Sequence, residues 1–218
     1  MNKNELTPQE RFNAIIKDCM APLLKKNGFK KKGTKFTRED EDLIYIVKTY
    51  KSQWNTKEEL DFRIEWGLEI KEEKKKPGLP FYGEVLQGDL YDFTKDAELQ
   101  WFHLKHDNID PILNDKKIKE NIYYNLDSKI LPFLFSFHFI QDVIRAIENN
   151  MKKEALWDRP GGGQTLLFLT ILYYFIGKPQ TSLKRIEQAI QEATIDSYQK
   201  DLQETRQKII DLISREKT

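Results

Sequence analysis

The sequence predicts an α+β protein with one N-terminal helix, an antiparallel sheet of about five or six strands, and a helical C-terminal half. Two changes in the spacing of apolar residues carry this prediction. The spacing is helical up to Gly28, becomes the two-residue alternation of strands after it, and returns to helical from about Asp110. We therefore expect an α+β sheet domain over residues 1–110. A helical region over residues 111–218 should pack on it, either as a second domain or within one continuous domain.

The first helix begins at the sequence Thr7-Pro8-Gln9-Glu10. Thr7 is a capping residue, Pro8 stands at the first helical position, and Glu10 completes a capping box. Pro22 should kink or split this helix, and Asn27-Gly28 should end it. Its apolar residues recur on one face, which predicts a buried stripe. The stripe consists of Phe12, Ile15, Ile16, Cys19, Leu23 and Leu24.

The predicted sheet begins with a lysine-rich hairpin whose turn is Gly33-Thr34. Its lysines, Lys30–Lys32 and Lys35, are expected at a sheet edge, where they discourage pairing with other chains. The clearest strand alternates apolar residues with mostly charged ones from Leu60 to Ile70, so one of its faces should be buried. A charged loop follows at 71–80. The predicted strands are 29–32, 35–38, 43–50, 60–70, 82–90 and 99–104.

The C-terminal half reads as a series of amphipathic or buried helices. A near-heptad stripe of apolar residues in the last of them is typical of a core face, although such a stripe can also bind a partner helix. We therefore expect that any oligomer would form through the C-terminal helices. The predicted helices are 115–124, 126–149, 164–176, 179–192 and 195–214.

Four separated pieces of the first two thirds of the chain are similar to one known family. They are Gly28-Phe29-Lys30-Lys31, Phe36-Thr37-Arg38, Lys51-Ser52-Gln53-Trp54-Asn55 and Trp66-Gly67-Leu68, in this order. Over roughly residues 8–145 the chain resembles the bacterial proteins grouped as domain of unknown function 4304. The resemblance implies the fold and a bacterial cytoplasmic setting, but it brings no known reaction. One departure is Glu65-Trp66, where the resemblance leads us to expect a small polar residue before the glycine.

Composition narrows the possible functions. Thirty-six Lys and Arg residues balance 35 Asp and Glu residues, so the net charge of +1 gives no overall field that would attract a polyanion. The overall charge therefore does not favour nucleic-acid binding. Such binding would need a local basic patch, for example the basic hairpin. Thirteen Phe, nine Tyr and four Trp residues exclude a mainly disordered chain.

Location is addressed by the N-terminal sequence and by the apolar segments. The stretch MNKNELTPQERF has no apolar run of the kind that a secretory signal contains, so we expect a cytoplasmic protein. The longest apolar run, 166–176, is far shorter than the ~20 residues that cross a bilayer, so no membrane association is expected. The single cysteine, Cys19, has no partner in the chain for a disulfide and is expected to be a small buried apolar residue.

The motifs that could support catalysis or cofactor binding are weak. The glycine run Gly161–Gly163 lacks the ending of a phosphate-binding loop and is better explained as a hinge, although an anion site is the alternative. His103, His106, Asp107 and Asp110 match no established metal-binding spacing. We therefore predict no metal and no cofactor. No nucleophile motif is present, so no catalytic residue can be assigned and an enzyme is not favoured.

These observations leave three hypotheses for function. The first is a protein-binding module, which could act in immunity-like systems of bacterial conflict. The second is a small enzyme or ligand-binding protein with a pocket between the sheet and the helices. The third is nucleic-acid binding through the basic hairpin. The residues predicted to line the binding site are Tyr50, Trp54, Arg63, Trp66 and His103.

Overall fold

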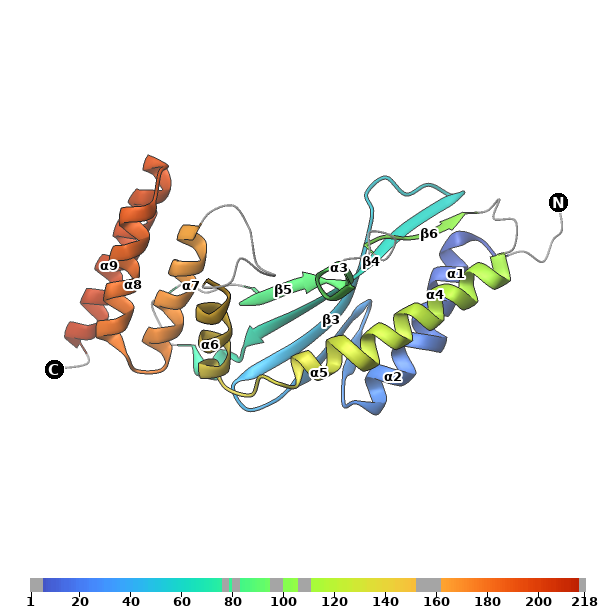
Figure 1. The fold of residues 1–218 in the computed structure, drawn as a ribbon, viewed down its shortest axis with the longest axis horizontal. Coiled ribbons are helices and arrows are strands. Elements are labelled where there is room, and N and C mark those ends of the chain that lie inside the picture. The colour runs from blue at the N-terminus through green and yellow to red at the C-terminus, as the bar shows by residue number, and fades with distance from the viewer. Residues whose placement is uncertain are drawn as a thin grey trace. The chain divides into compact units, whose positions relative to one another are not determined.

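The computed structural model describes residues 6–75, 79, 83–94, 100–105, 111–151 and 162–215. The chain divides into two compact units (Figure 1). We call the first the sheet unit; it consists of Met1–Asp40, Ile44–Glu69 and Leu86–Ser136. The helical unit consists of Glu41–Leu43, Ile70–Val85 and Phe137–Thr218. The predicted α+β class is confirmed, with an N-terminal helix, a six-stranded antiparallel sheet and a helical C-terminal half.

The sheet is built around two long central strands. Its order is β1-β2-β3-β4-β5, and β6 also pairs with β4. The short strands β5 and β6 pair with different stretches of β4, so they divide one of its edges between them. The lysine-rich strand β1 lies at the end of the order, as predicted. The strands are β1 (Lys30–Lys32), β2 (Lys35–Glu39), β3 (Leu43–Lys51), β4 (Glu59–Ile70), β5 (Leu86–Asp89) and β6 (Phe102–Lys105).

The first helix is split at the proline, as the sequence predicts. The capping box of Thr7 and Glu10 starts α1 (Pro8–Ile15), a π-helical turn (Ile16–Met20) follows, and α2 (Ala21–Lys26) contains Pro22. The widened turn accommodates a residue that has no N–H and whose ring would clash with a carbonyl one turn earlier. All six residues of the predicted apolar stripe are buried.

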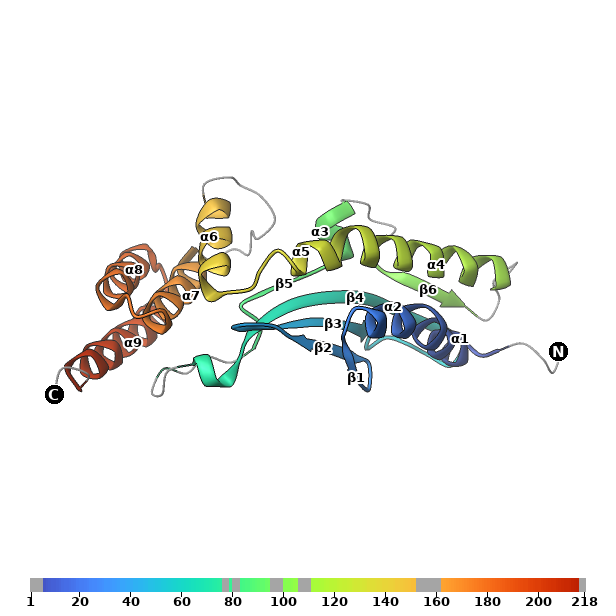
Figure 2. The same cartoon turned by 90° about the horizontal axis from the view of Figure 1, so that it is seen from below.

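A π-helical turn followed by a proline occurs a second time in the sheet unit. Helix α4 (Pro111–Asn125) runs into a π-helical turn (Leu126–Ile130), and then α5 (Leu131–Leu134) carries Pro132 at its second position. Figure 2 shows α5 continuing the line of α4. In both places a π-helical turn allows a proline to sit within a nearly continuous helix.

The buried face of β4 forms the core of the sheet unit. Phe62 contacts Phe12 of α1, with 5.0 Å between the ring centroids. Trp66 is only 1% exposed and contacts Phe93 of α3 (Leu90–Thr94) and Phe133 of α5. Opposite Trp66 in β5 stands Gly88, where a Cβ atom would lie 2.7 Å from the indole ring. The absence of a side chain at Gly88 therefore makes room for the tryptophan.

Cys19 is buried, as predicted. Its thiol donates a hydrogen bond to the carbonyl of Lys119 at 3.3 Å, and burial raises the pKa of Cys19 to about 11.

Because this pKa is about two units above the ordinary value, we expect Cys19 to react with a thiol reagent at least about a hundredfold more slowly in the folded protein than in urea at pH 8. The unfolded chain loses this proton first, so the thiol should also lower stability as pH rises from about 9 to 11. An exposed thiol introduced by Ser128→Cys provides the fast-reacting control. Equal rates for Cys19 in the folded and unfolded states would contradict this environment.

The helical unit contains four α-helices and one 3-10 helix (Glu72–Lys74) among its described residues. Helices α7 and α8 are joined by a turn in which Gly177 has φ of 71°, and α8 packs against α9 around Leu166, Ile186, Ala189 and Leu202. None of the helices in the described part of the chain is long and apolar enough to span a membrane. The α-helices are α6 (Ile140–Met151), α7 (Gly162–Phe175), α8 (Pro179–Glu192) and α9 (Asp196–Arg215).

Two expectations for the elements are wrong. The predicted helix 126–149 is interrupted at residues 135–139, because the Asp142 carboxylate accepts the backbone N–H groups of His138 and Phe139 and so starts a new helix, α6. Burial raises the pKa of Asp142, but these N–H groups and Arg145 outweigh it and hold the pKa below its usual value. The short helix α3 was also not predicted. This helix lies between β5 and β6 in the sequence.

Candidate functional site

The second face of β4 carries polar side chains that are half-buried. Asp61, Arg63 and Glu65 alternate with the buried residues of the strand and therefore point away from Phe62 and Trp66. The register of β4 with β6 places His103 directly opposite Asp61. We call this side of the sheet the polar face.

Arg63 forms the centre of the polar face. Its guanidinium carbon lies 5.0 Å from the centroid of the Tyr50 ring and 5.2 Å from that of Trp101. These two rings contact each other edge to face. Glu65 accepts hydrogen bonds from the same guanidinium, at 2.8 Å from Nε and 2.6 Å from Nη2. The arginine is thus fixed by two aromatic rings and one carboxylate, and its side chain is still 31% exposed.

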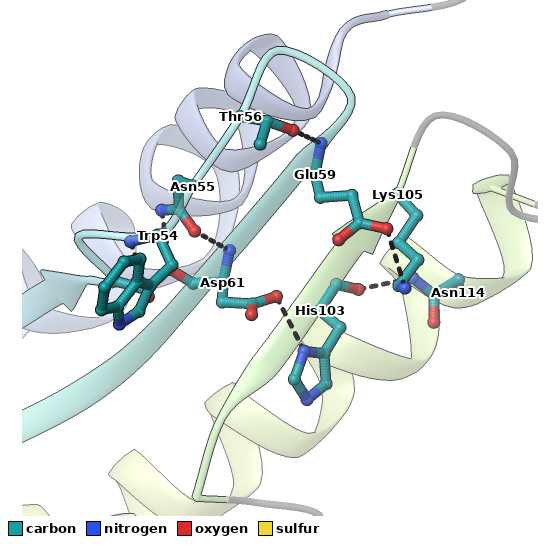
Figure 3. A network of polar contacts seen from close by, with 9 residues as sticks. Trp54, Asn55, Thr56, Glu59, Asp61, His103, Lys105 and Asn114 are labelled. Carbon is teal, nitrogen blue, oxygen red and sulfur yellow. Dashed lines mark hydrogen bonds and ion pairs between the residues drawn. The ribbon is translucent and has the colours of Figure 1, made fainter.

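Two polar pairs lie along the β4–β6 end of this face (Figure 3). His103 Nδ1 is 2.7 Å from Asp61 Oδ1, and Lys105 Nζ is 2.9 Å from Glu59 Oε1. Both pairs are cross-strand neighbours in the register, and all four side chains are at least a third exposed. Both carboxylates in this part of the face therefore have a partner at close range.

The loop between β3 and β4 is held by its own side chains. Asn55 accepts the backbone N–H of Asp61 at 2.7 Å and donates to the Asp61 carbonyl at 3.0 Å (Figure 3). The hydroxyl of Thr56 accepts the backbone N–H of Glu59 at 3.1 Å. On this fixed loop Trp54 is 82% exposed. A large apolar ring is thus presented to solvent on backbone whose conformation is already fixed.

The structure brings four of the five predicted site residues to neighbouring positions. Tyr50 and Arg63 are in contact, His103 pairs with Asp61 two residues before Arg63, and Trp54 lies on the loop that Asn55 ties to Asp61. Trp66 belongs elsewhere, because it is buried on the opposite face of β4. Trp101 was missed. The alternation of the predicted strand 99–104 places Trp101 on the same face as His103, so this pattern could have identified Trp101 as a site residue.

The metal and anion motifs noted in the sequence lie partly outside the described residues. No group of three or more His, Cys, Asp or Glu side chains among them could hold a metal ion. His106, Asp107 and Asp110 of the histidine-rich stretch lie outside the described residues, as does Gly161. Gly162 and Gly163 begin α7.

Comparison with known families gives one match, to the family described as Domain of unknown function (DUF4304), over residues 20–136. The chain belongs to this family. The matched range contains the whole sheet from β1 to β6, the loop with Trp54 and helices α4 and α5. A search of curated proteins and a search of solved structures found no match. Within this DUF4304 protein the polar face lies entirely in the family's domain, whereas α6–α9 lie beyond it.

Proposed function

We propose that this DUF4304 protein is a protein-binding module and that its polar face, together with the Trp54 loop, is the binding surface. The observation that carries the proposal is Trp54, which is 82% exposed on a loop fixed by the Asn55 and Thr56 hydrogen bonds. Burying such a ring against a partner is favourable. Because the loop is already ordered, it loses little conformational entropy on binding. A rigid exposed tryptophan is therefore a strong candidate for a binding anchor.

The composition of the neighbouring surface supports the same function. Tryptophan, tyrosine and arginine dominate the residues whose truncation weakens protein complexes most. Here Tyr50, Arg63 and Trp101 form one contact cluster, with Tyr50 46% exposed. The hydrogen-bonded Asp61–His103 pair and the Glu59–Lys105 ion pair lie beside it. An aromatic centre with paired charges around it resembles the core and rim of a protein interface.

A ligand-binding or enzymatic role is the alternative, and the exposed Asp61–His103 pair favours it as a possible acid–base pair. Its support is weaker, because Tyr50, Arg63 and His103 lie on the face of the sheet opposite the aromatic rings of α1, α3 and α5. A pocket between the sheet and the helices would therefore not use them. Nucleic-acid binding through the basic hairpin comes third. The cytoplasmic and bacterial setting, an immunity-like role, and an oligomer through the C-terminal helices stay predictions.

The proposal is tested by capturing partners of the tagged protein in its native host. Trp54→Ala should reduce recovery of a specific protein about thirtyfold, since anchor residues contribute about 2 kcal/mol or more. Tyr124→Ala removes another exposed aromatic ring, 61% exposed on α4, and should leave recovery unchanged. Equal recovery with both variants would refute the proposed surface.

A further inference from the structure

Three lysines stand directly opposite one another across three adjacent strands. The register pairs Lys32 of β1 with Lys35 of β2, and Lys35 with Lys48 of β3. Residues directly opposite in a sheet lie on the same face, and their Cβ atoms are about 5 Å apart. Phe36, next to Lys35, is fully buried on the other face. Lys32, Lys35 and Lys48 therefore form a continuous row on the polar face, which we call the lysine row.

Two of the three lysines of the row have no acidic partner in the described part of the chain. Like charges directly opposite in a sheet are destabilising. Lys48 is paired with Glu65 at 3.5 Å. Among the residues that the structure describes, neither Lys32 nor Lys35 forms an ion pair. The charges of Lys32 and Lys35 are therefore available to an acidic partner, in addition to their role at the sheet edge.

The lysine row also leads directly into the proposed binding surface. Lys48 and Tyr50 are two residues apart on β3 and so lie on the same face. Lys48 and Arg63 share Glu65 as their acidic neighbour. One surface thus combines a basic end, made of the lysine row, with an aromatic end around Tyr50, Arg63 and Trp101.

We infer that the partner docks through an acidic segment whose carboxylates lie along the lysine row and whose apolar side chains reach Tyr50 and Trp54. This inference rests on the proposed protein-binding function. A peptide fits the surface better than a nucleic acid, because the cations away from the lysine row, Arg63 and Lys105, are already paired with Glu65 and Glu59. At the β4–β6 end Asp61 and Glu59 would repel the phosphate that every nucleotide carries, whereas a peptide can present neutral residues there.

Lys35→Glu is the decisive variant. It converts the row into alternating charges, so the melting temperature should stay the same or rise, while recovery of the captured partner should fall at least about tenfold. Lys35→Arg should retain recovery. Lys117→Glu makes the same charge change on the exposed surface of α4 and should alter nothing. The region of the partner protected in the complex should be rich in Asp and Glu.

The outcomes separate this inference from the proposed function. If Trp54→Ala abolishes recovery and Lys35→Glu does not, the partner binds the surface but is not recognised by its acidity. If Lys35→Glu lowers both recovery and the melting temperature, the lysine row is structural and the inference fails. Recovery that is lost on nuclease treatment would show a nucleic acid and overturn both. Recovery that is insensitive to Trp54→Ala refutes the proposed function itself.

Discussion

Replacing Arg11 by methionine is expected to lower the free energy of unfolding by about 3 kcal/mol. Arg11 is only 3% exposed, and every nitrogen of its guanidinium has an acceptor. Asp115 of α4 accepts from Nε at 3.0 Å and from Nη2 at 2.6 Å, and the Lys105 carbonyl of β6 accepts from Nη1 at 2.7 Å. One side chain therefore connects α1, α4 and the edge strand β6. Its loss leaves a carboxylate and a strand carbonyl without their donor.

Urea unfolding of Arg11→Met, Asp115→Asn and the double variant measures this contribution. The double variant should be less destabilised than the sum of the two single variants, because the partners act as one unit. Asp18→Asn is the matched control. It removes another ion pair that joins the first helix to α4, but Asp18 and Lys119 are 3.6 Å apart with side chains 52% and 34% exposed, so the loss should stay below about 1 kcal/mol. Equal losses from Arg11→Met and Asp18→Asn would contradict the structure.

Trp66→Ala is expected to cost about 3–5 kcal/mol, the range found when a buried aromatic side chain is truncated. The indole is enclosed by Phe93 and Phe133, and its N–H donates to the carbonyl of Asp89 at 3.3 Å. Gly88 lies against the ring, and the paired strands leave little freedom to close the cavity.

The chain supplies its own control for this truncation. Trp54→Ala removes the same side chain from an exposed position, so the free energy of unfolding should change by less than about 0.5 kcal/mol. Thermal and urea unfolding of the two variants make the comparison. A large loss of stability for Trp54→Ala, or a small one for Trp66→Ala, would mean that their placement is wrong.

Local signals in the sequence predict those parts of the fold that local interactions determine. The capping box at Thr7, the hairpin around Gly33 and the alternation of β4 depend on neighbouring residues, and all three are confirmed. The break before α6 was missed because the apolar pattern continues across it. Asp142 is a weak capping signal when it is read without knowledge of where the chain turns.

The candidate site depends on strand pairing, which the alternation of one strand does not reveal. Arg63 and Trp101 come from β4 and from the approach to β6, and only the register of these strands brings them together. Trp66 could have been removed from the predicted site, because its own strand pattern places it with the buried residues. The role of Arg11 could not be predicted, since both Asp115 and the Lys105 carbonyl are distant in sequence.

Photo-cross-linking from position 54 in living host cells tests the binding surface most directly. Benzoylphenylalanine in place of Trp54 should give a light-dependent adduct with one protein, attached within a segment rich in Asp and Glu. The same group in place of Tyr124 should not form this adduct. Adducts that are identical at the two positions, or an adduct with nucleic acid at position 54, would contradict the assignment of this face to a protein partner.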